Sequence, residues 1–156
     1  MSARVLGLYF DEFPLDEEYT SPGRTVTETD LVTFSGISGD YNPLHSDVEF
    51  AKASPFGQRI AHGALVFSLA TGLTSRLGVI EGTAIAFLGM TWKFRKPVFI
   101  GDTIRVRLRA TKKRAVGAEA GMLFADVSII NQRDEVVQNG EWTVMVKRKP
   151  AQQTEP

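Results

Sequence analysis

One long apolar stretch in the middle of the chain constrains the fold most. Residues 63–77 are small and apolar nearly all round, as these side chains show: Ala64, Leu65, Val66, Phe67, Leu69, Ala70 and Leu73. A helix that lacks a polar face is buried inside a protein. We therefore expect a central helix that begins at Gly63 and runs to Leu77. It would stop at Gly78, because glycine is common just after a helix end.

The second half of the chain has the two-residue period of β-strands. Over residues 103–110, arginines occupy one face and apolar side chains the other: Ile104, Val106, Leu108 and Ala110. This is the pattern of a half-buried strand, and it recurs at Leu123, Ala125, Val127 and Ile129. Residues 84–95 and 136–147 are further strand candidates. One apolar helix followed by several strands predicts an α+β fold, with an antiparallel sheet wrapped around the helix.

Size and charge exclude several classes of protein. The 156 residues fit one domain, to which we assign residues 1–150, and a polar tail at 151–156 that we expect to be disordered. Eighteen basic and eighteen acidic residues cancel, so no charge excess points to nucleic acid or to a membrane surface. No apolar run reaches the ~20 residues that span a bilayer. The first residues lack the hydrophobic region of a signal peptide, and we expect a cytoplasmic protein.

Cysteine and histidine usage narrows the chemistry. The chain has no cysteine, so it has neither a disulfide nor a thiolate nucleophile. His45 and His62 are its two imidazoles, and their spacing is not that of metal ligands. We therefore expect no metal site.

Residues with catalytic potential gather just before the apolar helix. Asp40 and His45 flank Asn42-Pro43, which is a turn signal because proline moves the preceding residue out of helical geometry. A carboxylate and an imidazole placed this way can face one point in space. The helix start at Gly63 offers an unpaired backbone N–H. These three groups can activate water, move a proton and stabilise a negatively charged oxygen.

Two capping patterns predict shorter helices ahead of the central one. Thr27 with Asp30 predicts a helix that starts at the next residue after Thr27. Ser46 with Glu49 predicts a second, very short helix, in which Asp47 would be a first-turn acid that suits the helix dipole.

Two sequence blocks carry a family resemblance. The first is Asp40-Tyr41-Asn42-Pro43-Leu44-His45, with Asp47 just after it, and the second is Ile60-Ala61-His62-Gly63. A wider fit covers residues 22–27, residues 94–98 and Gly101-Asp102. With these blocks, most of the chain resembles the MaoC-like, (R)-specific enoyl-CoA hydratase family of hot-dog fold proteins.

The resemblance implies a function. It implies reversible hydration of trans-2-enoyl-CoA to (R)-3-hydroxyacyl-CoA, with Asp40 and His45 activating water and the Gly63 N–H polarising the thioester carbonyl. No cofactor is implied, since coenzyme A is part of the acyl-CoA substrate. Family members form dimers with active sites near the subunit interface, so we expect a homodimer or a dimer-based higher oligomer.

Three further residues each have two interpretations. Asn42 forms the turn before Pro43, or its side chain bonds the active-site loop. His62 positions the turn before Gly63, or it contacts substrate. Thr71 falls, by the resemblance, near the catalytic Asp, or it bonds its own helix backbone. We assign all three to substrate binding. The arginine face of residues 105–109 is interpreted as a solvated sheet face in preference to a site for coenzyme A phosphates.

Two other functions stay open. An acyl-CoA thioesterase would also use a carboxylate and a helix N-terminus, and it would release free coenzyme A. A non-catalytic acyl-thioester-binding protein would keep the pocket without turnover. The pairing of Asp40 with His45 around Asn42-Pro43 favours the hydratase over the thioesterase. It also argues against a non-catalytic binding protein, because such a protein has no need of both groups.

Overall fold

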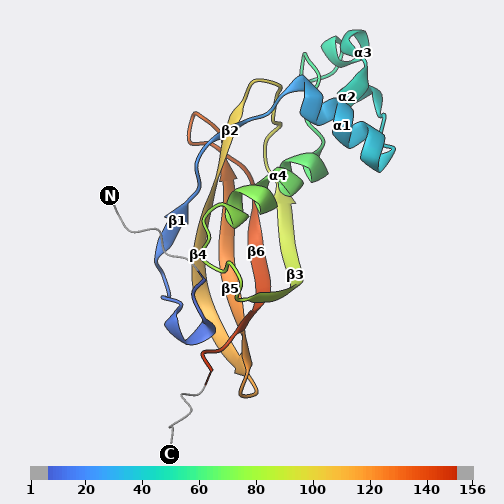
Figure 1. The fold of residues 1–156 in the computed structure, drawn as a ribbon. Coiled ribbons are helices and arrows are strands. Elements are labelled where there is room, and N and C mark those ends of the chain that lie inside the picture. The colour runs from blue at the N-terminus through green and yellow to red at the C-terminus, as the bar shows by residue number, and fades with distance from the viewer. Residues whose placement is uncertain (1–6, 151–156) are drawn as a thin grey trace, which may run out of the picture.

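The protein is an antiparallel sheet packed along one helix (Figure 1). The computed structural model describes residues 7–150, so the tail expected at residues 151–156 lies outside the described part. The strand order is β1-β4-β5-β6-β3, and β2 also pairs with β4. All of these pairs are antiparallel, and the strands are β1 Glu18–Thr20, β2 Arg24–Thr25, β3 Ala84–Phe94, β4 Thr103–Val116, β5 Ala120–Ile130 and β6 Val136–Lys147.

The alternation in β4 and β5 builds the core. Val106 pairs with Ile129 and Leu108 with Val127 across the two strands, and all four side chains are buried. They form one cluster with the buried residues of the central helix. Because successive strand side chains point to opposite faces, the arginines of β4 face away from that helix. The predicted α+β arrangement is confirmed.

The central helix, α4 (Gly63–Ser75), is buried on one side only. Its inward residues belong to the main core cluster: Leu65, Val66, Ala70 and Leu73. The opposite face is exposed and carries Ala64, Ser68, Thr71 and Ser75. The expectation of burial all round is therefore wrong for the single chain, because its sheet covers one side of the helix.

The end of α4 also differs from the prediction. The helix ends at Ser75, two residues before the predicted end at Leu77, and Arg76 is its C-cap. The N–H of Leu77 donates to the carbonyl of Thr74, three residues back, so a tighter turn replaces the last expected helical bonds. Gly78 follows in that turn with a left-handed φ of 74°.

Helices α1 (Glu28–Ser38), α2 (Pro43–Ser46) and α3 (Val48–Lys52) lie together beyond one end of the sheet (Figure 1). We call residues 28–52 the helical segment. As predicted, α1 starts after Thr27, whose side chain forms a capping box with Asp30. It ends at Gly39, whose φ of 74° turns the chain into Asp40.

The N-cap residue of α3 differs from the one predicted. Asp47, not Ser46, is its N-cap, and Oδ1 of Asp47 accepts the N–H of Phe50 at 3.0 Å. Ser46 belongs to α2 instead, and its hydroxyl donates to the carbonyls of Tyr41 and Asn42. Ser46 and Asp47 are both typical N-cap residues. Because Ser46 is the last residue of α2, Asp47 caps α3 instead.

Residues 10–13, ahead of β1, pack on the sheet far from α1. Phe10, in the short 3-10 helix Phe10–Glu12, and Phe13 are buried in a second cluster with Leu123 and Val146. Lys113 of β4 donates to the carbonyl of Phe13 at 3.0 Å. Among the helices of residues 7–150, none has both the length and the apolar character of a membrane span.

Candidate active site

The start of α4 is fixed to the sheet by hydrogen bonds. The N–H of Ala61 donates to the carbonyl of Val98 at 2.8 Å. Gln138 of β6 is 2% exposed, and its Nε2 donates to the carbonyl of Gly63 at 3.0 Å. The backbone just before and at the first residue of α4 therefore has a defined position relative to the strands.

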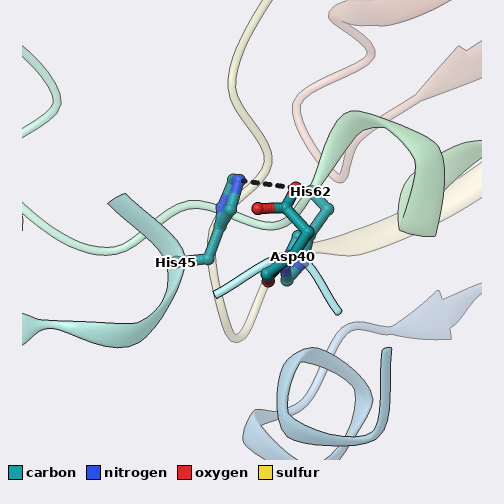
Figure 2. Close-up of side chains that lie close together, drawn as sticks. All are labelled: Asp40, His45 and His62. Atoms are coloured by element: carbon teal, nitrogen blue, oxygen red, sulfur yellow. Dashed lines mark hydrogen bonds and ion pairs between the residues drawn. The ribbon is translucent and has the colours of Figure 1, made fainter. Parts of the chain in front are cut away.

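Asp40 and His45 come together beside this helix start (Figure 2). Nε2 of His45 lies 4.0 Å from Oδ2 of Asp40, and Nδ1 of His45 lies 2.8 Å from the carbonyl oxygen of Ile60. A carbonyl only accepts, so Nδ1 carries the hydrogen, and the lone pair of neutral His45 is on Nε2, which faces Asp40. The 4.0 Å gap is too long for a direct hydrogen bond, but one water about 2.8 Å from each atom bridges such a pair.

The turn between the two side chains is built from local bonds. Oδ1 of Asp40 accepts the N–H of Asn42 at 3.1 Å, and Oδ1 of Asn42 accepts the N–H of Leu44 at 3.0 Å. Asn42 is thus the N-cap of α2, with Pro43 in the first turn. One oxygen of Asp40 holds the turn and the other faces His45. The contacts of Asn42 within the chain fit its turn interpretation, and its substrate-binding role stays a prediction.

His62 lies beneath this pair. Its ring is 1% exposed and stacks on the ring of His45, with centroids 3.8 Å apart and planes 29° apart. Nε2 of His62 is 3.0 Å from the backbone carbonyl oxygen of Asp40 and 3.2 Å from Oγ of Ser35. These contacts are with protein groups, and contact of His62 with substrate stays a prediction.

Gly63 combines an N–H at the helix start with a position on a cleft. As the first residue of α4 it has no intrahelical acceptor for its N–H, and the helix dipole makes that end positive. Gly63 lines a cleft of about 500 Å³ together with Phe56, Ile60, Phe94, Lys96 and Pro97. A Cβ on Gly63 would lie 2.6 Å from the ring of Phe94, so a side chain here would displace that ring.

An ion pair ties the loop before α4 to the helical segment. Nη1 of Arg59 lies 2.8 Å from Oε1 of Glu28, the first residue of α1. This hydrogen bond holds the pKa of the Glu28 carboxyl below its usual value and raises the pKa of Arg59. The pair anchors the chain one residue before Ile60, whose carbonyl orients His45.

The structure does not bring Thr71 or the β4 arginines to this place. Thr71 is about two turns further along α4, and its hydroxyl donates to the carbonyl of Ser68 at 2.7 Å. This bond fits the helix-backbone interpretation, and a substrate contact stays a prediction. On the other face of the sheet, Arg107 pairs with Asp134 at 3.0 Å and Arg109 with Asp126 at 3.3 Å. Both pairs fit a solvated sheet face.

The cluster of Asp40, His45 and His62 resembles a metal site in composition only. Ligand atoms of the three side chains lie within 4.8 Å of one another. Nε2 of His62 faces a carbonyl and therefore carries a hydrogen, while its Nδ1 is shielded from solvent. That leaves the Asp40 carboxylate and Nε2 of His45 as accessible donors, fewer than the three protein ligands of a catalytic zinc site.

Sequence reasoning missed three contributors to this site. Ser35 has a signal in retrospect, because it follows buried Leu31 by four residues and is a polar side chain on the buried stripe of α1. Gln138 is likewise a buried polar residue on an alternating strand. The Ile60 carbonyl has no sequence signal, because any residue supplies a carbonyl.

Comparisons with known proteins identify relatives of the whole domain. A model of the MaoC like domain matches residues 12–130. Protein MaoC of Klebsiella aerogenes is 42% identical over 106 residues, which are 67% of this chain and 31% of that protein. The chain thus spans about a third of the length of this relative. An (R)-specific enoyl-CoA hydratase of Rhodospirillum rubrum is 33% identical over 147 residues, covering 94% of this chain and 97% of that enzyme.

A solved structure from Mycobacterium tuberculosis, described as a double hotdog fold, shares the architecture. It superposes with a TM-score of 0.82 at 22% identity, covering 96% of this chain and 46% of that one. The α+β sheet-and-helix arrangement is therefore a hot-dog fold. With the domain match and the relatives above, the chain belongs to the MaoC-like domain family.

Proposed function

We propose that the protein is an (R)-specific enoyl-CoA hydratase, which adds water reversibly to trans-2-enoyl-CoA to give (R)-3-hydroxyacyl-CoA. The observation that carries the proposal is the 4.0 Å gap between His45 Nε2 and Asp40 Oδ2 beside the start of α4. The named activity of the Rhodospirillum rubrum relative, at 33% identity over nearly its whole length, supports it.

The reaction needs a base for water, a proton for carbon 2 and a partner for charge on the thioester oxygen. A water held between Asp40 and His45 gives a proton to one of them, and its oxygen bonds to carbon 3. The electron pair of the double bond moves toward the carbonyl, and carbon 2 then takes a proton from the Asp40–His45 pair, which returns the pair to its starting protonation. A positioned acid or base of this kind contributes roughly 100- to 10,000-fold to a rate.

The thioester oxygen becomes enolate-like during this addition. We place it against the Gly63 N–H, at the positive end of α4, with the acyl thioester in the cleft that Gly63 lines. In other enzymes, one hydrogen-bond donor aimed at a developing oxyanion contributes about 3–4 kcal/mol of transition-state stabilisation. No cofactor is assigned beyond the coenzyme A of the substrate.

We also propose a homodimer formed through β3. This strand is at one end of the sheet and pairs with β6 alone among the described strands. It exposes large apolar side chains along its length: Ile85, Phe87, Leu88, Met90 and Phe94. An unpaired apolar edge favours association with another strand, and a second copy would also cover the exposed face of α4.

Light scattering tests the assembly. We expect a mass of two chains or a multiple of two at micromolar concentration, and a shift toward one chain on Leu88→Lys. A stable monomer for the parent protein would remove the dimer from the proposal.

The activity is tested with trans-2-enoyl-CoA thioesters of increasing chain length. Hydration removes the absorbance of the conjugated thioester without releasing a thiol. Release of free coenzyme A would instead identify a thioesterase. Binding without loss of absorbance or thiol release would identify a non-catalytic acyl-thioester-binding protein.

A further inference from the structure

His62 is a buried imidazole that the proposed reaction does not use, yet it touches both residues that the reaction needs. We propose that His62 is a positioning residue that sets the distance between the Asp40 carboxylate and Nε2 of His45. This role rests on the proposed hydration. It differs from a direct role because His62 is 1% exposed and its ring stacks on that of His45.

The first contact fixes the Asp40 backbone. Nε2 of His62 lies 3.0 Å from the Asp40 carbonyl oxygen, and an oxygen that only accepts requires a hydrogen on that nitrogen. Oγ of Ser35, at 3.2 Å, shares the same hydrogen. The opposite tautomer would place the lone pair of Nε2 against the carbonyl lone pairs, so the geometry selects the Nε2–H tautomer.

The second contact fixes the His45 ring. The two imidazoles stack with centroids 3.8 Å apart, and the ring of Phe34 lies 5.0 Å from that of His62. His62 is therefore packed between α1 and His45. The hydrogen bond from Nδ1 to the Ile60 carbonyl holds His45 in the plane of its ring. Stacking on His62 restrains the tilt of the His45 ring out of that plane.

Through these two contacts, His62 connects Asp40 and His45, the two residues between which the proposed water is held. A shift of the Asp40 main chain carries Oδ2 with it, and a tilt of the His45 ring moves Nε2. Both movements change the 4.0 Å gap. Misplacement of a reacting group by about 1 Å costs on the order of 100-fold in rate. His62 thus acts on turnover through Asp40 and His45.

Two substitutions separate the contacts. His62→Phe keeps a flat ring against His45 but removes the N–H donor, and His62→Gln keeps a donor but removes the ring. With crotonyl-CoA, we expect each to lower kcat by about 10- to 100-fold, with KM within about twofold of the parent. His62→Ala removes both contacts and should lower kcat further than either.

Leu31→Val is the matched control. Leu31 is buried in α1 one turn before Ser35 and belongs to the main core cluster, so this variant weakens the same helix without touching Asp40 or His45. It should lower the melting temperature and leave kcat per folded molecule unchanged. Normal kcat in both His62→Phe and His62→Gln, with lower melting temperatures alone, would show a purely structural residue and overturn the proposal.

Nitrogen-15 NMR of the imidazole rings tests the geometry without turnover. We expect His62 in the Nε2–H form and His45 in the Nδ1–H form in the parent protein. A His62 ring with hydrogen on Nδ1 would overturn the positioning role. Absence of hydration by the parent would count against the proposed function, whereas parent activity with unchanged His62 variants would count against this inference alone.

Discussion

The helical segment, residues 28–52, and the strands β4 and β5 differ in what they bury. Ile104, Val106 and Ile129 of the strands have no exposed surface. In the helical segment, by contrast, Tyr41 is 63% exposed and the side chain of Asp40 is 51% exposed. The sheet holds the chain together, whereas the segment that carries the proposed catalytic pair, Asp40 and His45, is shaped by caps and side-chain bonds to its own backbone. Function and stability should therefore respond to different substitutions.

The largest difference between the effect on activity and the effect on stability should appear at the proposed catalytic pair. Asp40→Asn or His45→Gln should lower the hydration rate by at least about 100-fold, with little change in melting temperature because both lie outside the core. The double variant should lose less than the sum of the two free-energy effects, since both groups act on one water. Near-normal turnover by either folded single variant would contradict the assignment of Asp40 and His45.

A substitution in the core should lower stability and leave turnover unchanged. Ile129→Ala, at a side chain with 0% exposure, should lower the free energy of unfolding by about 2–5 kcal/mol, measured by urea denaturation. The kcat of the folded fraction should stay that of the parent. Ile129→Val, at about 0.5–1.5 kcal/mol, provides the same comparison if the alanine variant does not fold. A large loss of kcat in folded Ile129→Val would show that the two regions are not separable.

Gly63 at the start of α4 and Gly78, in the turn after its end, sharpen the comparison. Gly63→Val would fill the cleft beside the N–H and displace Phe94, so it should impair kcat/KM more than melting temperature. Gly78→Ala forces a side chain into a left-handed conformation, and it should cost about 1–2 kcal/mol of stability with normal kcat/KM. Parent-like hydration by Gly63→Val would move the carbonyl site to another N–H between Ser54 and Ile60.

The smallest effect is expected at a surface network after β5. Hydrogen bonds from Asn131, Lys96 and Arg133 lower the pKa of Glu135 from 4.5 to about 2. A lowered folded-state pKa contributes stability above pH 4.5 that is lost as the pH falls toward 2.

Glu135→Gln should therefore lower the melting temperature near neutral pH, and the difference from the parent should shrink as the pH falls from 4.5 to about 2. Glu141→Gln, at an exposed carboxylate of β6, is the control. A Glu135→Gln difference that does not depend on pH would contradict the network. Turnover at neutral pH should be normal in both variants.

The sequence predicts what is local or periodic. Alternation placed Val106 and Ile129 on the buried face, and Asn42-Pro43 placed Asp40 near His45, because a short turn fixes their relation. Pairs distant in sequence had no such signal: Ser35 and His62 meet across 27 positions. The exposed face of α4 was missed because small residues such as Ala64 and Ser68 suit both buried and exposed surfaces.

The stereochemistry of the reverse reaction tests the central claim most directly. The protein is incubated separately with (R)- and (S)-3-hydroxybutyryl-CoA, and formation of the conjugated thioester is followed by absorbance. We expect dehydration of the (R) enantiomer, abolished by Asp40→Asn, and no reaction of the (S) enantiomer. Dehydration of the (S) enantiomer, or of neither, would contradict an (R)-specific hydratase built on Asp40 and His45.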